Sequence, residues 1–169
     1  LGTLYHKILD NKDVLNLKNN EELKNYLNSL HNNGNLSEEE LKSINQDKFL
    51  KFLSSNVASR MRLALSKDKL LTEHQFIMGL KASEINKHMK SDELVLIQGV
   101  IDVYFEEDGE LVLLDYKTDK VDPVYGEAVF KKRYSIQLDY YERALEQLTG
   151  KKVKERIIYS FDLGKEIRL

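Results

Sequence analysis

The amino-acid sequence predicts an α/β fold in which a helical N-terminal layer precedes a core built on a mixed sheet. Three observations predict it. Apolar residues recur at helical spacing through residues 1–66. Two β-rich segments, 93–106 and 110–118, then follow one another closely. A long amphipathic segment, 124–148, separates them from a last β-rich segment at 153–162. This order of helices, hairpin, long helix and strand is typical of a mixed sheet.

The helices of the N-terminal layer have separate sequence signals. Residues 21–30 place leucines at helical spacing. Ser37 and Glu40 form a capping box, in which each side chain bonds the main chain of the other residue at a helix start. From residue 41 the helical spacing continues to about residue 66, with a break expected near 54–56.

The α/β core is expected over residues 70–162, with its first strand at 70–80. Asp108-Gly109 lies between the next two strands and is the strongest short signal for a two-residue hairpin. The long helix is expected to end at Gly150. It should place one stripe of side chains on a single face: Tyr134, Leu138, Tyr141, Leu145 and Leu148.

Composition excludes several classes of protein. The 169 residues contain no cysteine, which excludes a disulfide framework, a Cys-ligated zinc site and a Cys-bound iron–sulfur cluster. No apolar run approaches the ~20 residues of a membrane span and no signal peptide opens the chain, so we expect a soluble cytoplasmic protein without membrane contact. Because the chain begins at Leu1 rather than Met, we expect a fragment of a longer protein. The formal net charge of −2 argues against a free-standing nucleic-acid binder, unless basic residues cluster or a partner domain supplies the grip.

The hairpin register brings acidic residues together. If Asp108-Gly109 is the loop, Glu107 pairs with Glu110, and the same register places Asp102 opposite Asp115. Side chains alternate between faces, so Asp102, Asp115 and Lys117 share one face. The opposite face carries an apolar set: Ile101, Val103, Phe105, Val112, Leu114 and Tyr116.

Two opposed carboxylates destabilise a sheet by repulsion, because their Cβ atoms stand about 4.5–5.5 Å apart. A divalent cation resolves the conflict, since carboxylate oxygens suit Mg²⁺ and Mn²⁺. An edge hairpin whose aspartates face water is the other interpretation, and spacing alone leaves both open. Lys117 favours the cation, because an amine beside the ligands can act on an attacking water and a phosphate oxygen, as phosphodiester hydrolysis requires.

The order of these motifs resembles a known family. The matching segments are Gln98-Gly99-Val100-Ile101-Asp102, Leu114-Asp115-Tyr116-Lys117-Thr118-Asp119 and Gln137-x-x-x-Tyr141. Together they resemble the RecB-like branch of the PD-(D/E)XK nucleases, and most closely the C-terminal nuclease domains of the AddA family of bacterial helicase/nucleases. Supporting matches are His6 in Gly2-Thr3-Leu4-Tyr5-His6, Glu73-x-x-Phe76, and Glu155-Arg156-x-x-x-Tyr159-Ser160-Phe161.

The resemblance implies a restriction-endonuclease-like sheet and a set of site residues. By likeness to the family's motifs, the metal ligands are His6, Asp102, Asp115 and the main-chain carbonyl of Tyr116, with Asp102 and Asp115 also counted as catalytic. Lys117 resembles the family's catalytic lysine. Gln137 and Tyr141 resemble the helical motif that positions the DNA strand. Mg²⁺ is the implied cofactor, with Mn²⁺ as a substitute, and the cysteine cluster of some relatives, such as the AddB type, is absent.

Several residues keep a second interpretation. Glu73 is either a residue behind the ligands or at a second metal, or a solvated strand position. Tyr141 also fits the apolar stripe of its helix, so Gln137 is the stronger functional candidate. Lys131-Lys132-Arg133 is a compact basic patch that either contacts phosphate or forms a solvated helix face. The other histidines, His31, His74 and His88, are expected at the surface or at caps.

As function, the resemblance implies a nuclease domain of an ATP-driven helicase/nuclease that cuts the 3′-terminated strand during double-strand-break processing and recombinational repair. Its partners would be DNA, the protein's own helicase domains and an AddB-like subunit. No G-x-x-x-x-G-K-[ST] motif is present, so we expect no ATP site in this chain. The alternatives are a non-catalytic DNA-binding or docking module with the same fold, and a stand-alone phage-type exonuclease.

Overall fold

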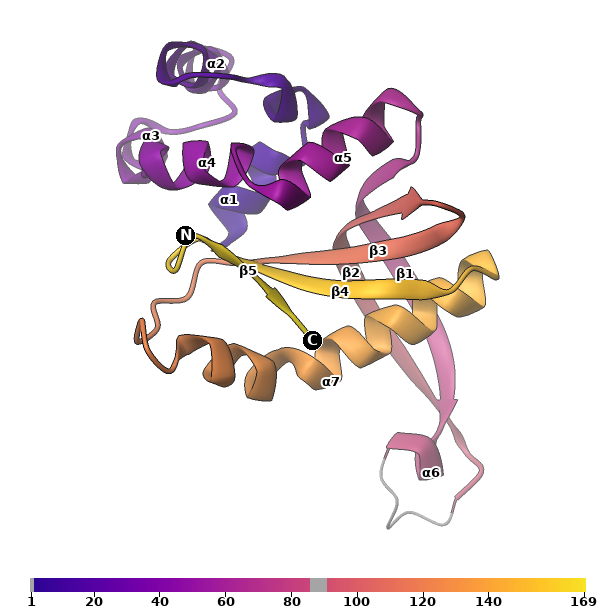
Figure 1. The fold of residues 1–169 in the computed structure, drawn as a ribbon. Helices are drawn as coiled ribbons and strands as arrows, with labels where there is room; N and C mark the ends of the chain where they lie inside the picture. Colours follow the sequence, from indigo (N-terminus) through magenta and orange to yellow (C-terminus); the bar gives the residue numbers. More distant parts are fainter. Residues whose placement is uncertain (1, 86–90) are drawn as a thin grey trace.

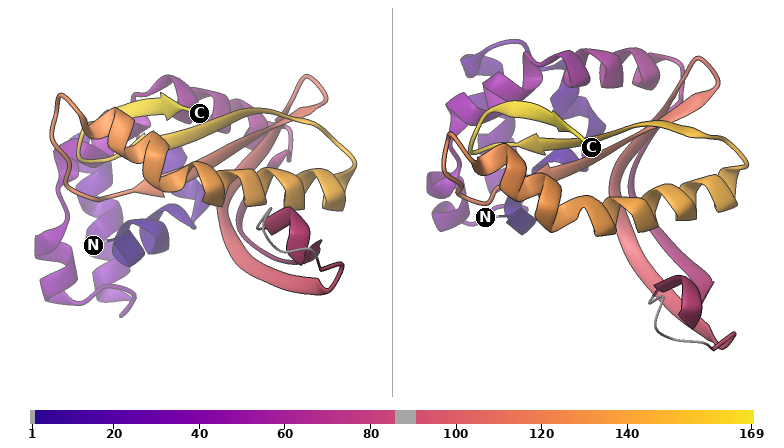
Figure 2. Two further views of the ribbon diagram at one scale, coloured as in Figure 1. Left: turned by 90° about the horizontal axis from the view of Figure 1, so that it is seen from below. Right: turned by 60° about the horizontal axis from the view of Figure 1, so that its bottom comes forward.

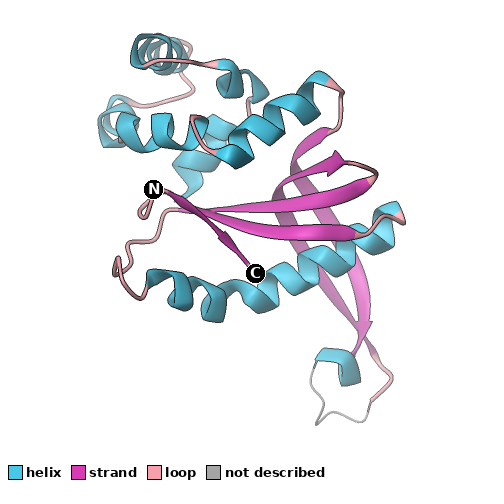
Figure 3. Ribbon diagram, in the orientation of Figure 1, coloured by secondary structure: helices cyan, strands magenta, loops and turns pink. Residues whose placement is uncertain are grey.

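The computed structural model describes residues 2–85 and 91–169, which form one mixed sheet with helices on both faces (Figures 1 and 3). The strands lie in the order β1-β2-β3-β4-β5. Their bounds are β1 Leu70–Lys81, β2 Leu94–Glu107, β3 Glu110–Lys117, β4 Val153–Ser160 and β5 Lys165–Arg168. Pairing is antiparallel except between β3 and β4, which are parallel. The predicted mixed α/β fold is therefore confirmed.

The helical layer lies over one face of the sheet (Figure 1). It consists of α1 Gly2–Leu9, the 3-10 helix η1 Lys12–Asn16, α2 Asn20–Asn32, α3 Glu38–Ser43, α4 Gln46–Leu53 and α5 Asn56–Ser66. The predicted capping box is present: the Glu40 N–H donates to Ser37 Oγ at 3.1 Å, and the Ser37 N–H donates to Glu40 Oε2 at 2.8 Å. The break near 54–56 is confirmed.

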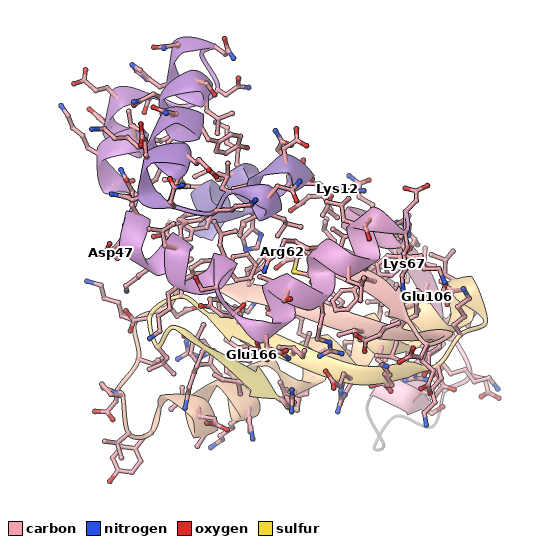
Figure 4. The ribbon with its side chains drawn as sticks, turned by 45° about the horizontal axis from the view of Figure 1, so that its top comes forward. Lys12, Asp47, Arg62, Lys67, Glu106 and Glu166 are labelled. Atoms are coloured by element: carbon pink, nitrogen blue, oxygen red, sulfur yellow. The ribbon has the colours of Figure 1, made fainter. Side chains whose placement is uncertain are left out.

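A second break, at Ile44 and Asn45, goes beyond the sequence-based prediction. Asn45 starts α4 by accepting a hydrogen bond from the Lys48 N–H at 3.1 Å, so this side chain caps a new helix rather than continuing the old one. Lys12 and Arg62 join the helices to their neighbours (Figure 4). The Lys12 ammonium donates to the main-chain carbonyl of Leu70 at 2.8 Å.

The long helix α7, Gly126–Thr149, connects β3 to β4 and covers the other face of the sheet (Figures 1 and 2). It ends at Gly150, whose φ of +69° is the left-handed conformation that glycine adopts without strain. Most of the predicted inward stripe packs against the sheet, but Leu148 is 59% exposed. That residue lies in the last turn of the helix.

Buried side chains form two clusters, one on each side of the sheet. The first, under α1–α5, contains an aromatic group made of Tyr5, Phe49, Phe52, Tyr116, Tyr159 and Phe161. The second packs α7 against the sheet and includes Phe76, Leu113, Phe130, Leu138 and Leu145. The motif that ends in Tyr159-Ser160-Phe161 is thus part of the core.

Three details differ from the sequence-based expectation or extend beyond it. β5 has no sequence signal, because four residues give too short a pattern; Glu166 in it accepts from the Val57 N–H at 2.7 Å and ties the sheet to α5 (Figure 4). Ile101 packs in the α7 cluster, not with Val103, because β1 and β2 leave the sheet at this point. His88 lies outside the described residues.

Beyond the sheet, β1 and β2 continue as a two-stranded arm that carries α6, Ala82–Ile85 (Figure 2). Its inner face packs Met78 and Leu80 into the α7 cluster, while Ile77 and Leu96 on its outer face are more than 70% exposed. Within the described ranges, no helix has both the length and the apolar character that crossing a membrane requires.

Candidate metal centre and active site

The site forms where the hairpin opens. Asp108 and Gly109, with φ of +55° and +84°, make the predicted turn, and the pairing runs from Glu107–Glu110 to Val103–Leu114. The predicted register is confirmed over these pairs. The next residues, Asp102 and Asp115, come together where main-chain pairing stops. There the Tyr116 N–H donates to Asp102 Oδ2 at 2.8 Å, so a side chain replaces the strand's main-chain partner.

His6 reaches this opening from α1. Its Nδ1 lies 3.3 Å from Asp102 Oδ1, and its Nε2 lies 3.3 Å from the main-chain oxygen of Tyr116. Tyr5 and Ile8, on either side of His6, are buried in the cluster under the helices. Packing of α1 therefore fixes the imidazole beside two of the predicted ligand groups, although more than ninety residues separate them in sequence.

Asp115 and Lys117 form a buried ion pair on the other side of the opening. The Lys117 ammonium lies 2.5 Å from Asp115 Oδ2, and the two side chains are 14% and 2% exposed. Burial raises the pKa of Asp115, and the positive charge of Lys117 opposes that rise. Burial acts to lower the pKa of Lys117, but the contact with Asp115 more than offsets it, so the ammonium form is favoured.

The carboxyl group of Asp102 carries the electrostatic cost of the site. Burial, together with the charge of Asp115, raises the pKa of Asp102 from 3.8 to about 6, while His6 and the Tyr116 N–H act in the opposite direction. Two carboxyl groups packed this closely favour an added positive charge. The observed electrostatics therefore fit a divalent cation held by oxygen and imidazole ligands.

Glu73 joins the site through an unusual backbone conformation. Its φ is +47°, which is left-handed and strained for a residue with a side chain, and the pairing of β1 with β2 omits Glu73 and Asp102. Ligand atoms of His6, Glu73 and Asp102 all lie within 4.8 Å of one another. Asp115 stands outside this group because Lys117 holds its carboxylate. Glu73 is thus closer to the ligand set than the sequence indicated.

An open cleft of about 710 Å³ lies over these groups. Asp102 and Asp115 lie buried beneath it, while the tip of Lys117 reaches it. The cleft draws its walls from α1, β1, the end of β3 and α7, and the residues are His6, Lys7, Asp10, Glu73, Tyr116, Lys117, Thr118, Asp119 and Tyr134. A cleft that exposes a lysine above buried carboxyl groups is suited to binding an anionic substrate.

Gln137 and Tyr141 lie one turn apart on α7 and contact each other: Gln137 Nε2 donates to the Tyr141 hydroxyl at 2.7 Å. The Tyr141 ring packs edge-on against Phe76, with centroids 5.6 Å apart, so this tyrosine is partly a core residue. Gly99 is required at this contact, because a Cβ there would lie 2.9 Å from the Phe76 ring and 3.3 Å from Tyr141. The Gly99-x-x-Asp102 spacing thus has a packing reason.

Two cleft residues escape sequence reasoning as functional candidates. The sequence places Tyr134 only in the apolar stripe and Asp119 only at the end of a motif, yet the Tyr134 hydroxyl donates to Asp119 Oδ2 at 3.0 Å beside Lys117. A tyrosine within an otherwise largely aliphatic stripe is the available signal. In the basic patch, Lys131 pairs with Glu127 at 3.1 Å and Arg133 with Asp119 at 3.5 Å, so part of its charge is already neutralised.

This constellation is that of a metal-dependent nuclease, and comparison with known proteins agrees. The sequence profile of the PD-(D/E)XK nuclease superfamily matches residues 1–166, and the chain belongs to this superfamily. It is a nuclease domain of the AddA type. The AddA-type protein of the ATP-dependent helicase/nuclease of Lachnoclostridium phytofermentans is 39% identical over 99% of this chain and 14% of its own length. The corresponding proteins of Clostridium kluyveri and Clostridium botulinum are 38% identical over 95% and 99% of this chain.

The matching region is a small part of each relative. The chain covers 13% of the C. kluyveri and C. botulinum proteins, so it spans about one-seventh of the length of the curated relatives it matches.

Proposed function

We propose that this chain is a divalent-metal-dependent deoxyribonuclease domain that hydrolyses DNA phosphodiester bonds. The observation that carries the proposal is the meeting of His6, Asp102, Asp115 and Lys117 at the opening of the hairpin, beneath a cleft. We further propose that residues 1–169 act as one nuclease domain, with 1–66 as its helical layer and 70–162 as its nuclease core.

The metal would be held by His6, Asp102, Asp115 and the main-chain carbonyl of Tyr116, with Glu73 as an additional carboxylate at the rim. The hard oxygen donors favour Mg²⁺, and the imidazole also suits Mn²⁺. When bound, such an ion lowers the pKa of a coordinated water and stabilises negative charge that develops on the phosphate.

The chain's own residues supply the rest of the chemistry. The Lys117 ammonium, which Asp115 holds at the floor of the cleft, provides positive charge beside the attacked phosphate. His6 and the Tyr116 N–H hold the carboxylate of Asp102 in one orientation. Gln137 faces the same region from α7, and Tyr141 fixes its amide, so that this pair would position the DNA strand.

In the context of a longer helicase/nuclease, we propose that the domain acts as an exonuclease on the 3′-terminated strand while helicase domains feed the DNA to it. This activity would serve double-strand-break processing and recombinational repair in the bacterial cytoplasm, together with an AddB-like subunit. The names of the relatives support this proposal, as does the net charge of −2, because a separate motor would supply the grip on DNA.

The direct test of the nuclease proposal is cleavage of a labelled single-stranded oligonucleotide in Mg²⁺ or Mn²⁺ by the wild type and by Asp115→Ala. We expect the variant to lose cleavage while its circular dichroism spectrum is unchanged. Asp139→Ala removes an exposed carboxylate on α7 and serves as the matched control, with cleavage retained. Equal cleavage by the wild type and Asp115→Ala would contradict the proposal and favour a non-catalytic DNA-binding module with this fold.

His6 is tested separately, because it comes from a different layer of the fold. Mn²⁺ binding measured by isothermal titration calorimetry should weaken in His6→Ala by about tenfold or more, as expected for loss of one ligand. His31→Ala is the control, since that side chain caps a helix end by contacting the Leu36 carbonyl at 2.9 Å. Unchanged Mn²⁺ affinity in His6→Ala would show that His6 is not a ligand.

A further inference from the structure

The Lys117 ammonium has a second neighbour besides Asp115. Its Nζ atom lies 4.4 Å from the centre of the Tyr134 ring, which is the geometry of a cation–π contact. The Lys117 side chain is 14% exposed, so the contact is largely shielded from water. A cation over an aromatic face interacts more strongly where water is excluded. The ammonium is therefore fixed from two sides, by a carboxylate and by a ring.

The Tyr134 ring is itself held in place. Its hydroxyl donates to Asp119 Oδ2 at 3.0 Å, and its ring stacks on Phe130 with centroids 5.6 Å apart and an interplanar angle of 25°. Arg133 lies 3.5 Å from Asp119 Oδ1 and orients the same carboxylate. These contacts join the segment after β3 to the first half of α7, on the wall of the cleft.

We propose that Tyr134 is the positioning residue for Lys117, and that Asp119 acts through it. Tyr134 would hold the lysine tip above Asp115 and directed into the cleft, where a scissile phosphate would lie. Without the ring, the four-carbon side chain of Lys117 gains rotamers that keep the ion pair with Asp115 but point the ammonium elsewhere. The consequence for catalysis rests on the proposed nuclease function, whereas the contact itself does not.

The contact is tested without DNA or metal. Protons above an aromatic face are shifted upfield, so the ε-methylene protons of Lys117 should resonate upfield of those of the other lysines in NMR spectra of lysine-labelled protein. The shift should persist in Tyr134→Phe, which keeps the ring, and vanish in Tyr134→Leu. A matched control is Tyr140→Leu, which removes the other half-buried tyrosine of α7 away from the cleft. An unshifted Lys117 signal in the wild type would overturn the proposal.

The positioning role is tested by separating rate from affinity. In single-turnover cleavage, Tyr134→Leu should slow the reaction by about tenfold, a loss within the range for a shielded cation–π contact. Binding of a fluorescent oligonucleotide in Ca²⁺ should change less than about twofold, because the lysine charge is still present. Tyr134→Phe should recover most of the rate, and Asp119→Asn should fall between the two.

The possible outcomes separate this proposal from the broader one. A normal cleavage rate in Tyr134→Leu, with the NMR shift lost, would refute the positioning role while leaving the nuclease function intact. Equal losses of rate in Tyr134→Leu and Tyr134→Phe would also refute it, because the hydroxyl rather than the ring would then matter. A wild type that never cleaves DNA would overturn the nuclease function and the role in catalysis together, with the NMR shift still present.

Discussion

Replacing Asp102 by Asn should stabilise the metal-free protein at neutral pH, and the gain follows from the site. Asp102 is 7% exposed, and burial with the nearby Asp115 raises its pKa from 3.8 to about 6. The folded protein therefore binds this proton more tightly than the unfolded chain does. Stability from this group is fully present below about pH 4 and is lost as the pH rises to about 6, with a total of about 3 kcal/mol. An asparagine has no such loss.

The measurement is urea denaturation in EDTA from about pH 4 to about pH 8, with the free energy of unfolding compared between wild type and Asp102→Asn. The asparagine amide oxygen can still accept the Tyr116 N–H, so the main-chain contact at 2.8 Å is kept. The advantage of the variant should grow between about pH 4 and pH 6 and then level off near 3 kcal/mol. Asp92→Asn, at a carboxylate that is 83% exposed, is the control without a pH-dependent gain.

Metal should reverse the order of stability. At a concentration of about 100 Kd, Mn²⁺ stabilises a protein by about 2.7 kcal/mol, and Asp102→Asn should lose most of this gain. A difference between the two proteins that stays constant from about pH 4 to pH 7 would refute the reasoning, because Asp102 would then not hold its proton more tightly in the folded state.

Two further predictions concern the lysines and the motif glycine. Lys117→Ala should lower single-turnover cleavage by orders of magnitude while DNA affinity and Mn²⁺ affinity stay near wild type, whereas Lys131→Ala should lower DNA affinity and its salt dependence if the basic patch contacts phosphate. Parallel loss of binding and cleavage in Lys117→Ala would make that lysine a phosphate anchor instead. Gly99→Ala should destabilise the protein by about 1–3 kcal/mol in urea denaturation, because a Cβ there would lie 2.9 Å from the Phe76 ring. Gly79→Ala on the same arm meets its nearest neighbour at 3.7 Å and should be tolerated, so equal effects of the two changes would contradict the packing explanation.

The sequence predicted those parts of the molecule that depend on local rules. The Asp108-Gly109 turn determines the register of its hairpin, and that register alone brings Asp102 near Asp115. The capping box at Ser37 likewise predicts a helix start, because its two hydrogen bonds form within four residues.

The remaining features depend on tertiary structure, which local rules do not contain. The left-handed conformation of Glu73 follows from no turn signal in its strand, and it appears only where β1 and β2 diverge from the sheet. Tyr134 fits a helical apolar stripe equally well as a core residue or as a wall of the cleft, and only the position of α7 decides between them. His6 is identified only by resemblance to a family motif, since nothing near it in sequence indicates Asp102 as its neighbour.

The site needs both layers of the fold at once. On one side, α1 delivers His6 because Tyr5 and Ile8 are buried in the cluster under the helices. On the other, α7 delivers Tyr134 to Lys117 because its neighbouring residues pack in the second cluster. The two carboxyl groups between these layers repel each other, and burial prevents water from screening that repulsion. Packing on both faces therefore holds in place an arrangement that its own charges would separate, and this stored repulsion is what favours the binding of a cation.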